Sequence, residues 1–378
     1  MGKNIVICCD GTANEFAENK TNVVKLFYIL ERDSAAQVIY YHPGLGTMEP
    51  SGALTTFTRK LTKLMGKAIG YGLQNDIRDV YTFLMDRFEP NDKVYMFGFS
   101  RGAYTVRAVA SLLRMYGLIQ SGNGPLVPYA IRMMLGISRS TRNMGGEPLS
   151  ARAYFDLAED FRDTMTQAAC HPWFVGVWDT VSSVGWIENP LKLPYVANNP
   201  DIRVGRHAVA IDERRAFFRN HLWRPSTTSG QSGPRDLKQV WFPGVHCDVG
   251  GGYPEAESGL SKIALEWMLE EAKSEGLLVN AEREREVLGG AGGGRYVSIP
   301  DPNAVAHDSL RGLWHIGELI PKRKYSWANN KWKRGCNLWR RRTIPPSSLV
   351  HESAWIRKDN YKSRLPPDAI RVGTMRKP

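Results

Sequence analysis

Residues 93–102 read KVYMFGFSRG, and this stretch decides how the whole sequence is interpreted. Its first seven residues predict a buried strand, and the apolar run 104–116 predicts a helix directly after the turn. The pattern G-x-S-x-G lies between them, with Ser100 flanked by Gly98 and Gly102. Small flanking residues let strand and helix approach closely, and the sharp turn leaves the serine strained and its hydroxyl exposed. Ser100 is therefore predicted to be a nucleophile, and the alternative is a serine in an ordinary βα turn.

Strands alternate with helices along most of the chain. Further strands are expected at 3–9, 37–41, 173–178 and 239–245, and helices at 21–30 and 259–276. This alternation predicts an α/β fold, with a mostly parallel central sheet and helices on both faces. The segments 44–72 and 117–170 interrupt the rhythm, and we expect either cap insertions over the strand ends or ordinary surface helices.

The composition excludes several classes of protein. Of the 378 residues, 42% are hydrophobic and 10% aromatic, which is enough for a sizeable core. No apolar run reaches the roughly 18 residues of a membrane span. The start of the chain, MGKNIVICCDGT, resembles a first strand rather than a signal peptide, so a cytoplasmic product is expected. The five cysteines include no C-x-x-C pair, which favours free thiols over a disulfide framework or zinc site.

A serine hydroxyl is a weak nucleophile until a base lies beside it. In the chain order of this type of site the acid follows the serine and the histidine comes last. Asp179 ends the predicted strand 173–178, and His246 follows the strand 239–245 and precedes a glycine-rich turn. We therefore expect Ser100, His246 and Asp179 to act together. Asp212 and Asp248 are the alternative acids, and a buried structural role is the alternative for His246.

The oxyanion that forms during acyl transfer needs two N–H donors. The Arg101 N–H at the start of the helix is expected to be one, because first-turn N–H groups lack intrahelical acceptors. The turn after the first strand is expected to supply the other, from Gly11 or Thr12. Asp10 in the same turn is interpreted as organising the loop through hydrogen bonds, with oxyanion support or metal ligation as alternatives.

Positive charge is concentrated near the C-terminus. The region between Leu319 and His351 holds no Asp or Glu and supplies nine positive charges of a net +12. Basic residues interleaved with tryptophan suit an anionic membrane surface or a nucleic acid backbone. A solvated loop with extended Lys and Arg side chains is the most favoured interpretation, a membrane surface comes second, and nucleic acid is the least favoured. The candidates for a membrane surface are Lys331, Trp332, Lys333, Arg334, Trp339, Arg340, Arg341 and Arg342.

No cofactor or metal is expected. Gly44-Leu45-Gly46 lacks the third glycine of a dinucleotide loop, and the pattern G-x-x-x-x-G-K-S/T of a phosphate-binding loop does not occur. We expect two regions: 1–320 as the catalytic domain, and 321–378 as a basic, Trp-containing C-terminal extension packed on or near the core.

Several longer motifs resemble one known family. They are CCDGTAN at the first strand, GFSRGAYTVRAVASLLRMYGLI around Ser100, VWDTVSSVG at Asp179, HAVAIDERRAFFRNHLW, and VWFPGVHCDVGGGYPE at His246. The chain is similar to the α/β-hydrolase domain family that includes phospholipase effectors of bacterial type VI secretion. The resemblance implies an α/β-hydrolase fold, a triad at Ser100, Asp179 and His246, and esterase or phospholipase activity.

The sequence therefore predicts a serine esterase, with phospholipid acyl esters as the favoured substrate. The alternatives are hydrolysis of a soluble ester or thioester, and a binding module that keeps the fold and uses its basic stretch. Expected partners are a lipid or ester substrate and an anionic membrane surface. The resemblance adds a delivery protein or an inhibitory, immunity-type protein, and delivery by a secretion system.

Overall fold

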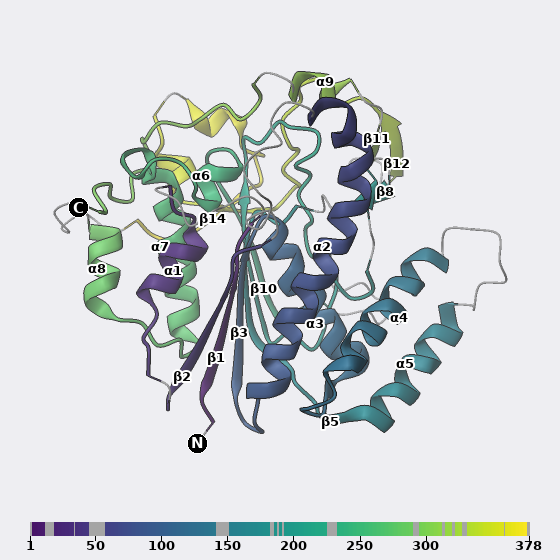
Figure 1. The fold of residues 1–378 in the computed structure, drawn as a ribbon. Helices are drawn as coiled ribbons and strands as arrows, with labels where there is room; N and C mark the ends of the chain where they lie inside the picture. The colour runs from purple at the N-terminus through teal and green to yellow at the C-terminus, as the bar shows by residue number, and fades with distance from the viewer. Residues whose placement is uncertain are drawn as a thin grey trace.

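Eight parallel strands form the central sheet (Figure 1). The computed structural model describes residues 2–11, 19–33, 35–44, 57–140, 151–181, 185–186, 189–190, 193–224, 233–289, 295–311, 314–319, 322–326, 331–358 and 360–375. In spatial order the strands are β14 (Ile370–Val372), β13 (Leu349–His351), β10 (Asp236–Phe242), β9 (Val204–Ala210), β6 (Pro172–Trp178), β3 (Lys93–Phe99), β1 (Asn4–Cys9) and β2 (Gln37–His42). Every neighbouring pair is parallel, so all the carboxyl ends meet at one edge. The predicted α/β fold with a parallel sheet is confirmed.

Helices cover both faces of the sheet, and each face has its own apolar core (Figure 1). One face carries α1 (Asn22–Ile29), α7 (Gly259–Ser274) and α8 (Ala281–Gly289). The other carries α2 (Phe57–Arg87), α3 (Arg101–Tyr116), α4 (Val127–Ser140) and α5 (Ala151–Met165). Full burial of a large aliphatic or aromatic side chain contributes about 1.5–3 kcal/mol, so the two cores supply the main stabilisation of the fold.

The remaining elements are short. Three two-stranded sheets pair β4 (Leu118–Ile119) with β5 (Thr166–Ala168), β7 (Gly185–Trp186) with β8 (Asn189–Pro190), and β11 (Lys322–Ser326) with β12 (Lys331–Gly335). The short helices are η1 (Gly124–Leu126), α6 (His246–Gly250), η2 (Glu255–Glu257), α9 (Trp314–Glu318), α10 (Ser353–Ile356) and η4 (Tyr361–Arg364). Figure 1 shows α6, α9 and the β11–β12 hairpin beyond the carboxyl ends of the large strands.

Two predicted elements have different limits in the structure. The strand expected at 239–245 is β10, which ends at Phe242. Pro243 lacks the N–H that would continue the ladder, and Gly244 turns the chain with a φ of 106°. The helix expected from Tyr104 begins at Arg101, so Ser100 alone makes the turn from β3 into α3.

Three strands of the sheet were not predicted from the sequence. β9 contains Arg206 and His207, and such polar residues hide the apolar pattern of a buried strand. The charge of Arg206 is balanced by Asp236 and Glu271, each at 2.6 Å, which only the folded chain brings together. β13 and β14 have three residues each and are too short to show a period. Both come from the predicted extension 321–378, which therefore shares the central sheet with the rest of the chain.

The two segments expected to be caps or surface helices are described in part. Residues 45–56 lie outside the described residues, and 57–72 form the first half of α2. In the second segment, α4 and α5 flank α2 and α3 and share their apolar core (Figure 1). The described part of 117–170 thus packs as outer helices of the fold, beside the sheet rather than over its carboxyl edge.

The start of α3 packs directly on the end of β1. A β-carbon added to Gly102 would lie 2.2 Å from the carbonyl oxygen of Cys9 and 2.4 Å from that of Asp10. Real β-carbons do not approach backbone atoms so closely, so only glycine allows the helix to meet the strand here. This contact fixes where the Ser100 turn lies relative to the carboxyl end of β1.

We therefore expect Gly102→Ala to lower the free energy of unfolding by about 1–3 kcal/mol, the usual cost of overpacking a core. Urea titration followed by circular dichroism would measure the loss. Gly124→Ala is the matched control, because its added β-carbon has no neighbour within 4 Å. Equal midpoints for the two variants would contradict this account of the contact.

Candidate active site

Ser100 lies in a strained turn at the carboxyl edge of the sheet. Its backbone has φ 58° and ψ −117°, a conformation that residues with side chains rarely adopt. Ser100 is held on both sides, since its N–H donates to the Trp178 carbonyl at 3.1 Å and its carbonyl accepts from Val181 at 3.4 Å. The turn aims the hydroxyl at a histidine, and Ser100 Oγ lies 2.8 Å from His246 Nε2.

His246 begins α6, four residues after β10 ends at Phe242. Its Nδ1 lies 2.5 Å from Asp179 Oδ2, so the ring bridges the serine and the carboxylate. Phe99 and Phe218 pack on the ring, with centroids 4.6 and 4.9 Å away, and the side chain is almost fully buried. This burial lowers the pKa of His246 below its ordinary value, although Asp179 opposes the shift. The imidazole is therefore neutral at pH 7 and able to accept a proton.

Asp179 follows β6 with a φ of 38°, a second strained position at the same edge. Its carboxylate is completely buried and accepts hydrogen bonds from His246, from the Ala210 N–H at 3.0 Å and from Arg342. Burial alone would raise its pKa, but the charge of Arg342 and the hydrogen bond from His246 outweigh it and hold the pKa well below the ordinary value. Asp179 is therefore a carboxylate throughout the neutral pH range.

The turn after β1 is organised by Asp10. Its Oδ2 accepts from Thr21 at 2.6 Å and from Tyr41 at 3.0 Å, and its Oδ1 accepts from the Gly11 N–H at 2.7 Å. The Gly11 N–H therefore donates to Asp10. The prediction of Gly11 as an oxyanion donor required this N–H to point into the active site instead. Thr12 lies outside the described residues. Arg101 is the first residue of α3, where its N–H has no intrahelical acceptor.

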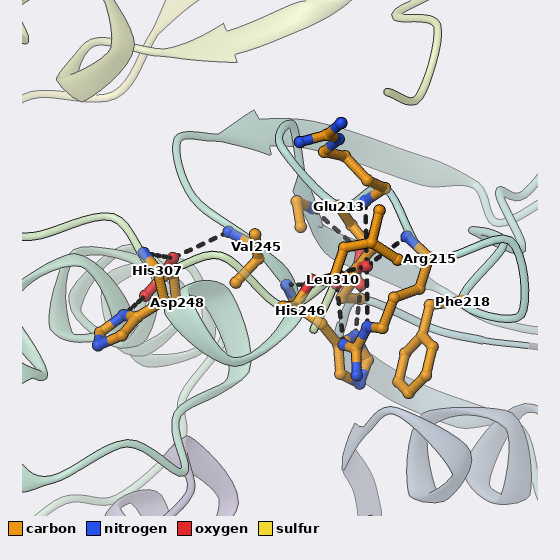
Figure 2. Close-up of polar contacts among 12 residues, drawn as sticks. Glu213, Arg215, Phe218, Val245, His246, Asp248, His307 and Leu310 are labelled. Carbon is orange, nitrogen blue, oxygen red and sulfur yellow. Dashed lines mark hydrogen bonds and ion pairs between the residues drawn. The ribbon is translucent and has the colours of Figure 1, made fainter. Parts of the chain in front are cut away.

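Glu213 is a buried residue of the site that the sequence analysis missed. Its carboxylate accepts from the His246 N–H at 3.2 Å, from Ser309 Oγ at 2.9 Å and from the Arg215 guanidinium at 2.9 and 3.0 Å (Figure 2). Burial would raise its pKa, but Arg215 lowers it to about 2. Glu213 therefore fixes the backbone of His246. It stands next to the alternative acid Asp212 in the motif AIDERRAFF, so the signal was present in the sequence.

Asp248 holds the backbone before His246 rather than its ring. Its Oδ2 accepts from the Val245 N–H at 3.0 Å, and its Oδ1 lies 2.6 Å from His307 Nδ1 (Figure 2). The other ring nitrogen of His307 lies 2.8 Å from Glu257, and Tyr253 stacks on the ring with centroids 3.6 Å apart. The hydrogen bond that the His307 ring donates to Asp248 raises the pKa of His307, although burial opposes the shift. His307 in the HDSL segment is thus a cationic bridge between two carboxylates.

Asp212 also supports the turn before His246. Its Oδ2 accepts from the Gly244 N–H at 2.9 Å and from the Tyr361 hydroxyl, and Arg341 and Arg364 lie 3.6 and 3.4 Å from Oδ1. Burial raises the pKa of Tyr361, so this phenol remains a donor. Among its described contacts Asp212 has none with the imidazole of His246. Asp179, and not Asp212 or Asp248, is the acid that meets the histidine ring.

The prediction of a membrane-surface role for Arg342 was wrong. Its side chain is only 8% exposed and points at Asp179, where it forms a buried ion pair. Arg340, Arg341 and Trp339 are exposed, although Trp339 Nε1 donates to His315 at 2.8 Å. The positions Lys331, Trp332, Lys333 and Arg334 lie on β12, and their side chains are outside the described part of the chain.

Other predicted features concern metals, thiols and membrane spans. In the described ranges no three His, Cys, Asp or Glu side chains gather as a metal site. Among the described residues the cysteines form no disulfide, and Cys8, Cys9 and Cys170 are buried. No helix among the described residues has the length and apolar character to cross a membrane.

Fold and site together define an α/β protein in which a strained serine, a histidine and an aspartate form a hydrogen-bonded chain at the carboxyl edge of a parallel sheet. The chain belongs to the family described as T6SS phospholipase effector Tle1-like, catalytic domain, which matches residues 3–271. This confirms the family resemblance of the sequence motifs.

Individual relatives are more distant. An uncharacterized protein of Saccharomyces cerevisiae is 34% identical over 234 residues, which are 59% of this chain and 33% of that protein. An uncharacterized protein from Pseudomonas aeruginosa is 20% identical, with a TM-score of 0.44 over 79% of this chain and 49% of that chain. The Tle1 effector bound to the VgrG spike of the type 6 secretion system is also 20% identical, with a TM-score of 0.32 over 68% of this chain and 52% of that chain. The chain thus spans a third to about half of these relatives.

The His307 bridge predicts a pH-dependent contribution to stability. Because folding raises its pKa, the contribution is complete below the unfolded pKa of about 6.5 and is lost as pH rises through the folded value. We expect His307→Gln to lower the Tm at pH 6 by about 2–4 °C and to change it much less at pH 9. His171→Gln is the control, since that side chain is 59% exposed. Equal losses at both pH values would show that His307 is neutral in the folded protein.

Proposed function

We propose that the protein is a serine hydrolase that cleaves carboxylic esters, and that its substrates are acyl esters of phospholipids. One observation carries the proposal: the Ser100–His246–Asp179 chain, with contacts of 2.8 and 2.5 Å between the reacting groups. The strained turn at Ser100 and the neutral, buried imidazole support it, because both are what an activated serine needs. Membership of a phospholipase effector family supports the choice of substrate.

The reaction would proceed in two halves. Ser100 Oγ attacks the ester carbonyl while His246 Nε2 takes its proton, and the resulting imidazolium protonates the departing alcohol. Asp179 holds Nδ1–H and stabilises the imidazolium. Water then attacks the acyl-serine with His246 again as base, which releases the fatty acid and restores Ser100. The Arg101 N–H is proposed as one oxyanion donor, with the turn after β1 as the source of the second.

The relatives also suggest how such an enzyme would reach its substrate. The Tle1 effector structure is a complex with a VgrG spike, and we propose that a delivery protein of that kind, or an inhibitory partner, acts on this chain as well. We further propose that the basic residues near the C-terminus other than Arg342, among them the exposed Arg340 and Arg341, bring the site to an anionic lipid surface.

The first test is labelling by a fluorophosphonate probe. We expect wild type to react, and Ser100→Ala and His246→Ala to lose labelling and to lose about 10⁴-fold or more in ester hydrolysis. Asp179→Asn should label slowly, because the histidine tautomer is no longer fixed. A panel of phospholipid vesicles and short soluble esters then defines the substrate. No labelling of folded wild type, with or without vesicles, would reject the hydrolase in favour of a binding module.

The membrane step predicts a loss that depends on the substrate. We expect Lys331→Glu, Lys333→Glu and Arg340→Glu together to lower hydrolysis of anionic vesicles by about 10-fold or more. Hydrolysis of a short soluble ester should stay within twofold of wild type. The control reverses three charges outside this region, at the exposed residues Arg132, Arg285 and Lys358, and so has the same net charge. Equal effects of the two triple variants on vesicles would reject a dedicated membrane surface.

A further inference from the structure

Arg342 meets Asp179 with both ends of its guanidinium. Nη1 lies 2.5 Å from Oδ1 and Nη2 lies 3.0 Å from Oδ2. The same two oxygens accept from the Ala210 N–H at 3.0 Å and from His246 Nδ1 at 2.5 Å. A carboxylate has about four lone-pair directions, so Asp179 is fully occupied, and Arg342 supplies half of its hydrogen bonds.

The guanidinium is itself fixed from the other side. Nη1 also donates to the Ala210 carbonyl at 3.1 Å, and Nη2 donates to the Phe218 carbonyl. Phe218 is the residue whose ring packs on His246. Arg342 therefore ties the end of β9, the loop after it and the carboxylate into one rigid unit around the imidazole.

The segment that carries Arg342 is anchored to the same loop. Asn337 Nδ2 donates to the Arg214 carbonyl at 2.8 Å and to Glu318 at 2.7 Å, and Glu318 accepts from the Ala216 N–H at 2.6 Å. Glu318, Asn337 and Arg342 lie beyond the family match, which ends at residue 271. A part of the chain beyond the matched catalytic domain thus reaches the centre of the site.

We propose that Arg342 is a positioning residue of the active site, which fixes both oxygens of Asp179 so that the Asp179–His246 pair is set for catalysis only with the C-terminal segment docked. The inference rests on the proposed serine hydrolase function. Arg342 touches neither the serine nor the scissile ester in the proposed mechanism, and it acts through Asp179.

Removal of this cation changes the titration of the pair. Burial raises the pKa of Asp179, and with Arg342 absent only His246 and the Ala210 N–H oppose it, so the pKa rises. The pKa of His246 rises too, because a nearby positive charge disfavours imidazolium. The acid limb of the pH–rate profile then moves to higher pH. The charged and titratable groups that face the pair are Arg342, His207, Glu213, Arg215 and Cys247.

The test compares wild type with Arg342→Gln, Arg342→Lys and Arg285→Gln. Arg285→Gln is the matched control, since it removes the same charge from an exposed side chain on α8. The readout is the rate of fluorophosphonate labelling from pH 4 to 9. We expect Arg342→Gln to lower the plateau about 10–100-fold and to move the acid limb up by about one pH unit. Arg342→Lys keeps the charge but loses the two-point contact of the guanidinium with Asp179. Its plateau rate should therefore fall, with a smaller shift of the acid limb than in Arg342→Gln.

Two results would overturn the inference. One is an Arg342→Gln profile equal to wild type. The other is a lower plateau with an unmoved acid limb that matches the fraction of unfolded protein by circular dichroism, which a merely structural role would produce. If Arg342→Gln does not fold, the Arg342→Lys profile decides the question. A plateau and an acid limb equal to those of wild type in Arg342→Lys would reject a role for the two-point contact of the guanidinium with Asp179.

A readout that needs no turnover separates this inference from the proposed function. The Nδ1 proton between His246 and Asp179 should give a downfield NMR resonance that shifts in Arg342→Gln and not in Arg285→Gln. If wild type is not labelled but this shift is seen, the hydrolase function fails and the positioning by Arg342 stands. If wild type is labelled and the resonance does not move in Arg342→Gln, the positioning role fails alone.

Discussion

The carboxylate of Asp179, removed from water and surrounded by donors, is the constraint on which the rest of the site depends. A buried unpaired charge costs several kcal/mol, so the fold must surround it with partners. Those partners come from separate parts of the chain: β9 through Ala210, α6 through His246, and the C-terminal segment through Arg342. The strand order places the ends of β6, β9 and β10 side by side, and this adjacency makes the convergence geometrically feasible.

Around this centre, the chain beyond residue 300 contacts the loops that follow β9 and β10. Ser309 bonds to Glu213, His307 bonds to Asp248, and Glu318 bonds to the Ala216 N–H. Asp248 in turn accepts a hydrogen bond from the Val245 N–H, and Glu213 accepts one from the His246 N–H. The position of the imidazole is therefore set by the contact of its ring with Asp179 and by backbone contacts to Glu213 and Asp248, and aromatic rings pack on it.

The same contacts decide which side chains of the site are charged at neutral pH. Asp179 and Glu213 stay ionised because guanidinium groups lie against them, whereas His246 stays neutral because burial outweighs the attraction of the carboxylates. A neutral base beside a permanent carboxylate is what transfer of a serine proton requires. The basic residues near the C-terminus also differ in their surroundings. Arg342 is buried in an ion pair with Asp179, whereas its neighbours Arg340 and Arg341 are exposed to solvent.

The sequence by itself determined the strands that precede Ser100, Asp179 and His246 and the helix that follows Ser100, because apolar period and glycine spacing are local properties. It also favoured this serine, aspartate and histidine, since each follows a strand and parallel strands end at one edge, but it left Asp212 and Asp248 open as the acid. Only the tertiary structure decided that β9 joins the sheet, that Glu213 holds His246, and that Arg342 turns inward. These depend on pairing between residues far apart in the chain, and a basic run has the same sequence pattern whether its side chains meet water or a buried carboxylate.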